Sequence, residues 1–513
     1  MHSSTSNNKR ITKNTLFLYI RMVIILFVQL YTSRVVLNIL GVNDFGLWNV
    51  IASLIVSFSF ISGPLTTSTQ RFLNYDMGCG GKQLREIFST SLLLFLLIGG
   101  ILFLLFETLG VWFLNSYLNI ASEKIYVAHC TFQFSILSFL AVFFRLPYES
   151  AIIAEEKMSF YAFLCIVESF LLLGIVYVLL LPGKIDKLIL YGALTFLSKT
   201  VISLCYIFFC NSKIIYTKFR FKLNREKAGE LMSFSGWNLF GAVAAASSTQ
   251  GINILLNLFF GVVVNAAYGI ASQVGAGVKS FISNFQKAVN PQIVKSYASL
   301  EIEYMHSLLC ATGKYSFFLL FALVFPLILN MDWVLQVWLG GTVPVNTALF
   351  CKLVLVQMLI VCIGDTMDTA IFATGKIKYY QITLSCILLL NIIVPYCIFK
   401  VGWGTAIYAL VVKCIVELAI LIARLYFVHK KIGLSIWVYF KRTLIPIFVI
   451  TIIMISLMSV VCNFHSFSTD WEGVMGECLF FYVGYIFCIW FIGIRKSERD
   501  KISLFVFNKV RRK

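Results

Sequence analysis

The chain has 513 residues, of which 59% are hydrophobic and only 13% are charged. Since a soluble protein carries about a quarter charged residues, this composition excludes a string of soluble domains and indicates a polytopic membrane protein. The formal net charge is +19, and the positions of the basic residues decide whether nucleic acid or the membrane explains it.

The chain begins with 14 polar and basic residues, followed by an apolar run that is too long for the hydrophobic part of a signal peptide. We therefore expect a permanent membrane span at this position. Apolar runs of similar length recur to the end of the chain and predict about 14 transmembrane helices. Their expected ranges are 15–38, 45–68, 87–113, 125–147, 159–181, 188–210, 234–257, 264–287, 314–338, 348–372, 378–399, 403–428, 442–462 and 477–494.

The basic residues lie unevenly between alternate loops. When residues at the ends of spans are counted with the adjoining loop, 31 of the 42 Lys and Arg residues fall on the side of the N-terminus, 4 fall on the opposite side and 7 lie within spans. This asymmetry is the positive-inside pattern and places both termini in the cytoplasm. The charge is therefore a topology signal, and we expect no nucleic acid as a partner.

The sequence repeats at an offset of 219 residues. The segment ESAIIAEEKMSFY at 149–161 matches DTAIFATGKIKYY at 368–380, and spans one to six map onto spans seven to twelve. An even number of spans in each copy makes the repeat parallel. We therefore predict an all-α integral membrane protein with two six-helix lobes around a central cavity. The predicted parts are an N-terminal lobe at 1–210, a basic linker at 211–230, a C-terminal lobe at 231–430, and two additional helices with a basic tail at 431–513.

Motifs of known enzyme chemistry do not occur in the sequence. It contains no HExxH, no CxxC and no nucleophile elbow, and GCGGKQ at 78–83 lacks the spacing of a phosphate loop. His129 is the one histidine within a predicted span, and a single imidazole does not make a metal site. We therefore predict a protein that is not an enzyme and has no cofactor or metal.

Four basic side chains lie within predicted spans that offer them no obvious carboxylate partner: Arg21, Arg34, Lys279 and Lys352. A charge at the centre of a spanning helix costs about 2.5–3.5 kcal/mol on insertion scales. One interpretation is a water-filled cavity lined by these cations. The alternative is that they pair with Glu107, Asp365 or Asp368 on other spans.

Other intramembrane charges are expected to pair with one another. Lys413 and Glu417 are one turn apart on a single predicted helix, which favours an ion pair. Glu168 and Lys199 are predicted to pair across spans five and six.

Several features predict conformational change. Glu149 and Asp368 occupy equivalent positions at the cytoplasmic ends of spans four and ten, and we expect both to help close an inner gate. Pro64, Pro326 and Pro395 interrupt spans two, nine and eleven and form either hinges or static kinks. The small and polar residues of 241–253 either pack closely or line a cavity.

The segment from Asn14 to Phe72 has the pattern NTLFLYIRM…YTSRVVLNILGVNDFGLWNVI…GPLTTSTQRF. This pattern resembles the start of the Wzx-type O-antigen and capsule flippases of the MOP superfamily, which also contains the MATE exporters. The run around Arg34, Gly41 and Gly46 is its most specific part. With the span count and the two-lobe repeat, the resemblance extends over essentially the whole chain.

The resemblance implies a multi-pass protein of the bacterial cytoplasmic membrane. Such a protein moves an oligosaccharide on a polyprenyl pyrophosphate from the inner to the outer leaflet by alternating access. It also implies that Arg34, and with it Arg21 and Arg71, helps to hold the anionic headgroup. Lys279 and Lys352 are added to this predicted site because they lie within spans. A proton or sodium ion as coupling ion and glycan polymerases or ligases as partners are further implications.

Two other functions are compatible with the composition. A MATE-type exporter of small cations would need a cavity rich in acidic and aromatic residues, whereas the predicted cavity is cationic. A membrane-embedded glycan polymerase or ligase would need a large external loop, and the longest one predicted here is 463–476.

Overall fold

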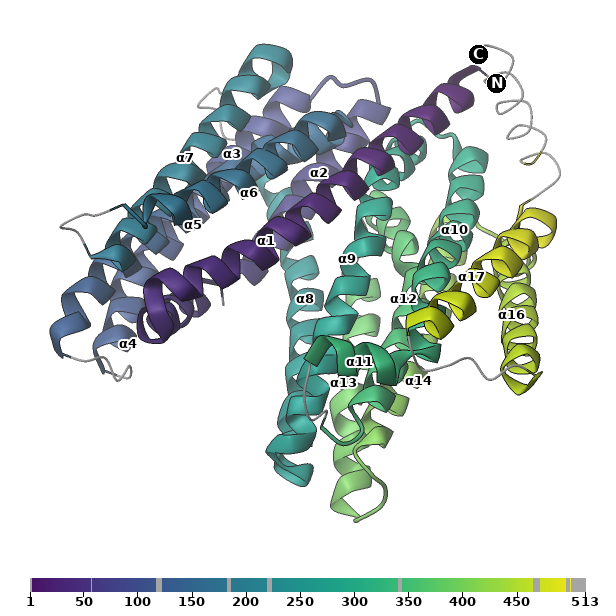
Figure 1. Ribbon diagram of the computed structural model, residues 1–513. Helices are drawn as coiled ribbons and strands as arrows, with labels where there is room; N and C mark the ends of the chain where they lie inside the picture. The colour runs from purple at the N-terminus through teal and green to yellow at the C-terminus, as the bar shows by residue number, and fades with distance from the viewer. Residues whose placement is uncertain are drawn as a thin grey trace, which may run out of the picture. The chain divides into compact units, whose positions relative to one another are not determined.

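The computed structural model describes residues 2–56, 58–116, 122–181, 186–218, 224–339, 344–464, 471–494 and 499. All regular elements in these ranges are helices, and no strand occurs in them (Figure 1). Ten of the helices are long and apolar enough to cross a membrane. A helix satisfies its own backbone hydrogen bonds, as a bilayer requires. The structure therefore confirms an all-α, multi-pass membrane fold.

The chain forms two compact units. Unit 1 consists of Met1–Val243, Lys287–Glu301 and Gly375–Gln381, and unit 2 consists of Ala244–Gln286, Ile302–Thr374 and Ile382–Lys513. Three helices contribute to both units: α8 (Arg225–Phe260), α9 (Val262–Ala298) and α13 (Lys378–Lys400).

Unit 1 is built from the first seven helices and from parts of the three shared ones. Figure 1 shows α1 running along α6, the helix on which it packs most extensively. The bounds are α1 (His2–Val56), α2 (Ser62–Gly78), α3 (Leu84–Leu105), α4 (Val111–Ser116), α5 (Ile125–Ala154), α6 (Met158–Val178) and α7 (Lys187–Lys213).

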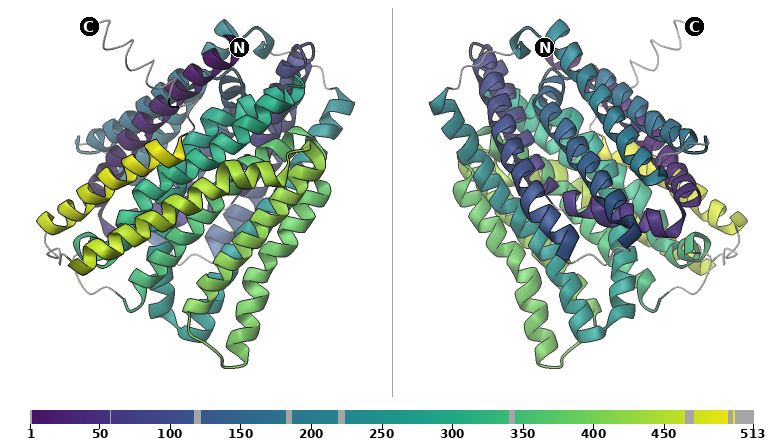
Figure 2. Two further views of the ribbon diagram at one scale, coloured as in Figure 1. Left: turned by 90° about the vertical axis from the view of Figure 1, so that its right-hand side faces the viewer. Right: turned by 90° about the vertical axis from the view of Figure 1, so that its left-hand side faces the viewer.

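Unit 2 contains the remaining helices, and in it α12 packs mainly on α14. Figure 2 shows α16 and α17, the last two helices, side by side at the yellow end of the colour range. The bounds are α10 (Ile302–Leu329), α11 (Met331–Leu339), α12 (Thr347–Ala373), α14 (Ile407–Ile432), α15 (Ile436–Tyr439), α16 (Ile445–Phe464) and α17 (Trp471–Cys488).

The first two predicted spans are separated inside α1. Gly41 has φ 76° and ψ 171°, which breaks the helix between them. A left-handed φ favours glycine because glycine has no Cβ. Just after this break, Asp44 accepts a hydrogen bond of 3.1 Å from Lys124, whose ammonium also contacts Asp186 at 3.0 Å. The GVND stretch of the sequence thus ends one helical segment and anchors the start of the next.

The second predicted span, 45–68, does not form one helix. Helix α1 ends at Val56, a short 3-10 turn covers Ser59–Ile61, and α2 begins at Ser62. Pro64 therefore lies in the first turn of α2, where its missing N–H costs no helical hydrogen bond. The predicted span is therefore interrupted next to Pro64, as predicted, and this proline lies at the start of the helix that follows the interruption.

The fourth predicted span is too short by about two turns. We predicted its end at residue 147, but α5 continues to Ala154 with Pro147 inside it. Arg145 and Glu149 are consequently helical residues and not part of a cytoplasmic loop. Asp368 lies inside α12, as predicted.

The backbone reproduces the repeat of the sequence. Helix α5 packs on α3 and α7 in unit 1, and α12 packs on α10 and α14 in unit 2. Left-handed residues also recur at the offset of 219: Gly81 (φ 72°) matches Leu300 (φ 62°), and Glu156 (φ 58°) matches Gly375 (φ 74°). The same turns therefore end equivalent helices in both copies.

Candidate functional site

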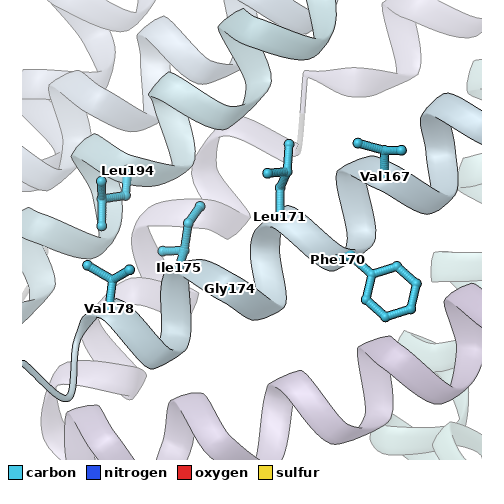
Figure 3. Close-up of a pocket in the computed structure, with 7 residues that line it drawn as sticks. All are labelled: Val167, Phe170, Leu171, Gly174, Ile175, Val178 and Leu194. Atoms are coloured by element: carbon cyan, nitrogen blue, oxygen red, sulfur yellow. The ribbon is translucent and has the colours of Figure 1, made fainter.

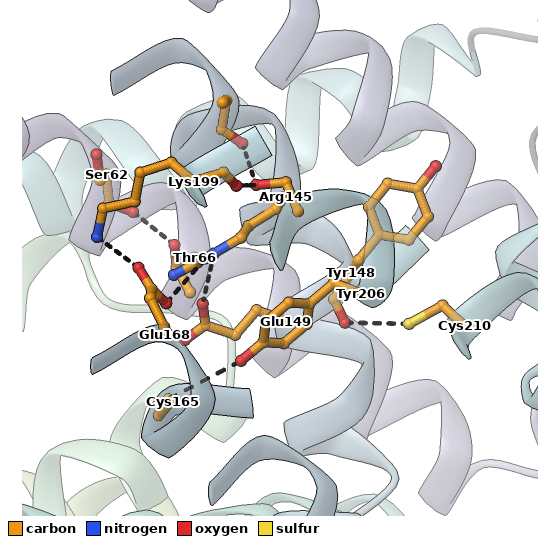
Figure 4. A network of polar contacts seen from close by, with 12 residues as sticks. Ser62, Thr66, Arg145, Tyr148, Glu149, Cys165, Glu168, Lys199, Tyr206 and Cys210 are labelled. Carbon is orange, nitrogen blue, oxygen red and sulfur yellow. Dashed lines mark hydrogen bonds and ion pairs between the residues drawn. The ribbon is translucent and has the colours of Figure 1, made fainter. Parts of the chain in front are cut away.

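Unit 1 contains a network of buried charges centred on Glu168 of α6 (Figure 4). One carboxylate oxygen of Glu168 accepts a hydrogen bond of 3.1 Å from Nη1 of Arg145, and the other accepts one from the ammonium of Lys199 on α7. The Nε of Arg145 lies 3.9 Å from the carboxylate of Glu149, one turn further along α5. The network joins α5, α6 and α7 through a single carboxylate.

The pairing of Glu168 with Lys199 was predicted and is confirmed. The contact of Arg145 with Glu168 was not predicted, because Arg145 lies at the end of the predicted span 125–147. Arg145 and Glu168 are each only 8% exposed, and the Arg145 guanidinium lies 5.1 Å from the centre of the Tyr206 ring. Glu168 thus supports two cations, so the network is a scaffold that holds three helices together.

Arg21 and Arg34, two of the predicted headgroup residues, both belong to helix α1. The guanidinium of Arg21 lies 4.9 Å from the centre of the Tyr161 ring and donates a hydrogen bond of 3.5 Å to the sulfur of Cys165 on α6. The side chain of Arg34 lies outside the described residues.

Arg71, the third predicted headgroup arginine, lies in an aromatic environment of unit 1. Its guanidinium is 4.5 Å from the ring centre of Phe72, 4.9 Å from that of Tyr75 and 5.7 Å from that of Phe234. A Cβ added to Gly375 would come within 2.8 Å of the Arg71 Nη2 atom. Arg71 therefore packs against the turn between α12 and α13.

Unit 2 encloses a cavity of about 310 Å³ among α8, α9, α12, α13 and α14. Its polar lining includes Lys279, Lys413 and Arg424, together with the carboxylates of Asp365 and Glu417. The cavity therefore lies where several intramembrane charges predicted from the sequence come together.

Among the described residues, Arg424 is the cation of this cavity that forms ion pairs with carboxylates. Its Nε and Nη2 atoms each lie 2.8 Å from an oxygen of Asp368, and its Nη1 lies 3.3 Å from Asp365. Bidentate pairs of this kind combine strength with fixed geometry. Asp368, which we predicted to act in a gate, is thus held by α14, and its gating role stays a prediction.

Lys279 and Lys413 have a different environment. Within the described part of the chain, neither forms an ion pair with a carboxylate, and Lys413 donates a hydrogen bond of 3.3 Å to the hydroxyl of Tyr268. Glu417 accepts a hydrogen bond of 3.0 Å from the amide of Gln357. The predicted Lys413–Glu417 ion pair is therefore wrong, because each side chain has a partner on another helix.

Lys352 lies apart from this cavity. Its ammonium is 3.1 Å from the carboxylate of Asp332 on α11, whose side chain is 72% exposed. Glu107, another considered partner for the cations, accepts a hydrogen bond from Gln133. The structure thus brings Lys279 to the cavity and leaves Lys352 in an exposed ion pair.

The segment 241–253 of α8 was predicted either to pack closely or to line a cavity, and it does both. A Cβ on Gly251 would lie 2.5 Å from Cδ1 of Ile392, which shows close packing on α13. Ser248 accepts a hydrogen bond of 3.0 Å from Asn391 and, with Ala245 and Thr249, lines the cavity.

A second hollow, of about 490 Å³, lies on α6 beside Leu194 of α7 (Figure 3). Val167, Phe170, Leu171 and Ile175 are among its lining residues, and none of the lining side chains can form a hydrogen bond. Such a surface suits only hydrocarbon. The polar cavity of unit 2 is accordingly the better candidate for a functional site. Among the residues that the structure covers, no group of three His, Cys, Asp or Glu side chains could hold a metal ion.

Solved structures of transporters share this fold. An outward-facing multidrug-resistance MATE transporter of the MOP superfamily aligns with a TM-score of 0.69 at 14% identity, covering 82% of this chain and 96% of the other. A MATE protein in the straight conformation gives 0.70 at 13% identity, with 84% and 97% covered. A MOP superfamily transporter from Pyrococcus furiosus, described as having a binding pocket of reversed polarity, gives 0.68 at 13%, with 82% and 96% covered. The chain therefore has the MATE-like fold.

Comparison by sequence adds nothing to this likeness, since no family model and no curated protein matches the chain.

Proposed function

We propose that this protein is a transporter of the MOP superfamily that works by alternating access. Its proposed substrate is an oligosaccharide on polyprenyl pyrophosphate, which it moves from the inner to the outer leaflet of the bacterial cytoplasmic membrane for the assembly of surface polysaccharide. The observation that carries the proposal is the presence of Lys279 and Lys413 in the lining of the unit 2 cavity, where neither forms an ion pair with a carboxylate among the described residues.

The two ammonium groups support an anionic substrate for an energetic reason. Charges within membrane spans are costly unless they are paired or hydrated. Arg424 in the same lining forms ion pairs with Asp365 and Asp368, so cations in this cavity can be paired with carboxylates of the same unit. A cavity that leaves two further lysines without such partners is suited to a ligand that brings its own negative charge, such as a pyrophosphate.

The fold likeness supports transport, and the sequence resemblance supports the substrate class. Solved structures with this fold are described in outward-facing, straight and bent conformations, so proteins of this fold adopt more than one conformation. One of them is described as having a pocket of reversed polarity that suggests a different function. The polarity of the pocket is therefore a property by which proteins of this fold differ. Outward movement of an anion is also favoured by about 2.3 kcal/mol per charge per 100 mV of inside-negative potential.

Export of a small cation by a MATE-type mechanism is the second candidate. The observation that favours it is Glu417, a cavity carboxylate that accepts a hydrogen bond from the neutral amide of Gln357. A carboxylate in that position could accept a proton or attract a cationic solute. Glu417→Gln should abolish export under this alternative and should affect the flipping of an anionic lipid much less.

Flipping can be measured with the purified full chain in liposomes that contain a fluorescent polyprenyl-pyrophosphate oligosaccharide. We expect Lys279→Met with Lys413→Met to abolish flipping, because methionine keeps the length of the side chain and removes the charge. Lys352→Met is the matched control, since it removes a lysine that is paired outside the cavity. Unchanged flipping in the double variant would refute the proposed site, and export of cationic dyes without any flipping would favour the second candidate.

Arg34, Arg21 and Arg71 remain part of the proposed headgroup path. Arg34→Ala should reach the membrane at normal abundance and fail to support surface glycan, whereas Arg34→Lys should keep partial activity because a point charge remains. Normal activity per folded molecule in Arg34→Ala would remove this residue from the site. In cells, deletion of the gene should cause lipid-linked oligosaccharide to accumulate on the inner leaflet.

A further inference from the structure

The ends of α2 and α9 meet at residues that are equivalent in the repeat. The thiol of Cys79, directly after α2, lies 3.6 Å from the carbonyl oxygen of Ala298, the last residue of α9. These two residues are 219 positions apart, which is the offset of the repeat. The crossing of α2 and α9 thus brings equivalent helix ends of the two copies into contact within unit 1.

This crossing is very close. A Cβ added to Gly78 would lie 2.6 Å from the carbonyl oxygen of Lys295 and would overlap the side chain of Ala298. Tyr75 and Tyr297 pack beside it with ring centres 6.4 Å apart. Small residues at the contact allow the two backbones to approach each other.

The turn between α5 and α6 closes against the same end of α9. Glu156 in this turn has a fully buried side chain, and its carboxylate lies 2.9 Å from the ammonium of Lys295 and 2.7 Å from the amide of Gln292. Lys295 also donates a hydrogen bond of 2.6 Å to the carbonyl of Ala154. The side-chain amide of Asn14 on α1 contacts the backbone carbonyl of Glu156 at 3.3 Å. One acidic residue thus joins the α5–α6 turn to α9.

The backbone at Glu156 is strained. Its φ of 58° lies in the left-handed region, which a residue with a Cβ rarely adopts, whereas the equivalent position in the second copy is Gly375 with φ 74°. The turn itself therefore requires only a glycine, and the glutamate is present for its side chain. Strain that the surrounding contacts maintain is a feature of switch regions.

We propose that the Glu156–Lys295 ion pair is a latch that holds the crossing of α2 and α9 shut at the predicted cytoplasmic end. This inference rests on the proposed alternating access, because only a transporter has to open and close this end. The latch is asymmetric: in the second copy, Gly375 packs against the guanidinium of Arg71 and offers no carboxylate. Opening requires the carboxylate of Glu156 and the ammonium of Lys295 to separate and become hydrated, and release of the turn relieves the strain at residue 156.

Cross-linking of the crossing tests the latch without measuring transport. Ala298→Cys is combined with the native Cys79, and a protease site is inserted within the predicted linker 211–230 of the full chain. A short bis-methanethiosulfonate reagent should join the two halves, so that they migrate together on a gel after proteolysis. Cys79→Ser in the same background should abolish the joined band and identifies the thiol that reacts.

Three further changes in this background decide the question. Glu156→Gly removes the latch and supplies the residue that the turn prefers, so the protein should stay folded while the initial cross-linking rate falls roughly tenfold through a population shift. Glu156→Gln keeps a neutral hydrogen-bond acceptor and should give an intermediate rate. Exchange of the two charges, Glu156→Lys with Lys295→Glu, should restore part of the rate.

The matched control is Lys227→Ala with Glu230→Ala, which removes an ion pair within a single helix of the same unit. It should leave the cross-linking rate unchanged. An equal rate in the parent and in Glu156→Gly would overturn the latch, whatever substrate the protein carries. A reduced rate in a protein that flips no lipid would keep the latch and refute only the proposed substrate.

Discussion

The equivalent carboxylates Glu149 and Asp368 are each held by a buried arginine, but the arginine comes from a different place in the two units. In unit 1, Arg145 lies one turn before Glu149 on α5 itself, at 3.9 Å from it. In unit 2, Arg424 reaches Asp368 from α14, with two contacts of 2.8 Å. The acidic residue therefore occupies the same position in both copies, whereas the arginine that contacts it comes from the same helix in unit 1 and from a neighbouring helix in unit 2.

The residue that replaces Arg145 in the second copy explains how this exchange is possible. Gly364 stands at the equivalent position, and a Cβ there would lie 3.0 Å from both Cδ and Nη1 of Arg424. The absence of a side chain on α12 therefore makes room for the arginine from α14. The loss of an arginine from α12 and the presence of one on the facing helix α14 thus keep a positive charge beside the equivalent carboxylate.

The two clusters have different surroundings. The unit 1 cluster connects three helices through Glu168, and the residue equivalent to Glu168 in the second copy is Ile387. In unit 2, Arg424 and Asp365 form part of a cavity wall. The buried charges of the first copy therefore connect helices to one another, whereas those of the second copy also line a cavity.

Removal of Glu168 should have the largest effect. Glu168→Ala leaves Arg145 and Lys199 without their carboxylate, and breaking a buried pair costs about 3–5 kcal/mol. We expect a large loss of membrane abundance and of thermal stability, measured by size-exclusion chromatography of heated, detergent-solubilised protein. Glu107→Gln, which keeps a hydrogen-bonding side chain near Gln133, is the control and should behave like the parent. A stable Glu168→Ala protein would show that the unit 1 cluster is not a scaffold.

Transfer of the arginine from α14 to α12 tests whether the two arrangements are interchangeable. Arg424→Ala should lower the free energy of unfolding by about 1–3 kcal/mol, because Asp365 and Asp368 lose their cation but are partly hydrated. Gly364→Arg added to it should recover part of this loss by placing an arginine one turn before Asp368, as in unit 1. Gly364→Ala alone should destabilise the protein through overlap with Arg424. A double variant less stable than Arg424→Ala would argue against the exchange.

Comparison of the two equivalent acids should give a smaller difference. Asp368→Ala loses two short contacts and should lower the melting temperature clearly. Glu149→Ala loses one distant contact, so its free energy of unfolding should change by less than about 1 kcal/mol and its melting temperature should change little. Equal melting temperatures would contradict the difference in pairing. Cysteine accessibility in the same variants tests the predicted gate separately, because a gating role shifts both toward an inward-open state.

The smallest effect is expected at Lys352. Its ion pair with the exposed Asp332 is worth about 0–1 kcal/mol, so Lys352→Ala should leave both the melting temperature and transport near the parental values. Lys279→Ala, measured beside it, should keep stability and lose transport. A transport defect in Lys352→Ala would return this lysine to the predicted headgroup site and weaken the distinction between the cavity and the surface of unit 2.

The pattern of apolar runs and the internal similarity of the sequence were sufficient to predict the helical fold and the repeat. The apolar runs predict most helices because each span must bury its backbone in hydrocarbon, and the offset of 219 residues follows from segments such as 149–161 and 368–380. The Glu168–Lys199 pair could be predicted as well, because two opposite charges in adjacent spans have few other partners.

The remaining pairs were decided by tertiary contacts. The pairing of Arg145 was missed because the residue lies at the predicted end of a span, and the sequence does not show that α5 continues for about two further turns, to Ala154. The Lys413–Glu417 pair failed because Gln357 and Tyr268, on other helices, compete for the two side chains. The partner of Glu156 lies 139 residues away on α9.

The sequence by itself therefore determined the local quantities: which segments are apolar enough to span a membrane, which side carries the basic residues, and how the two copies align. The tertiary structure alone decided which charge neutralises which, and so which lysines remain to face the unit 2 cavity. The physical reason is that hydrophobic burial acts on every segment according to its own composition, whereas an ion pair or hydrogen bond forms only between atoms within about 3–4 Å of each other. That proximity depends on how helices from distant parts of the chain pack together.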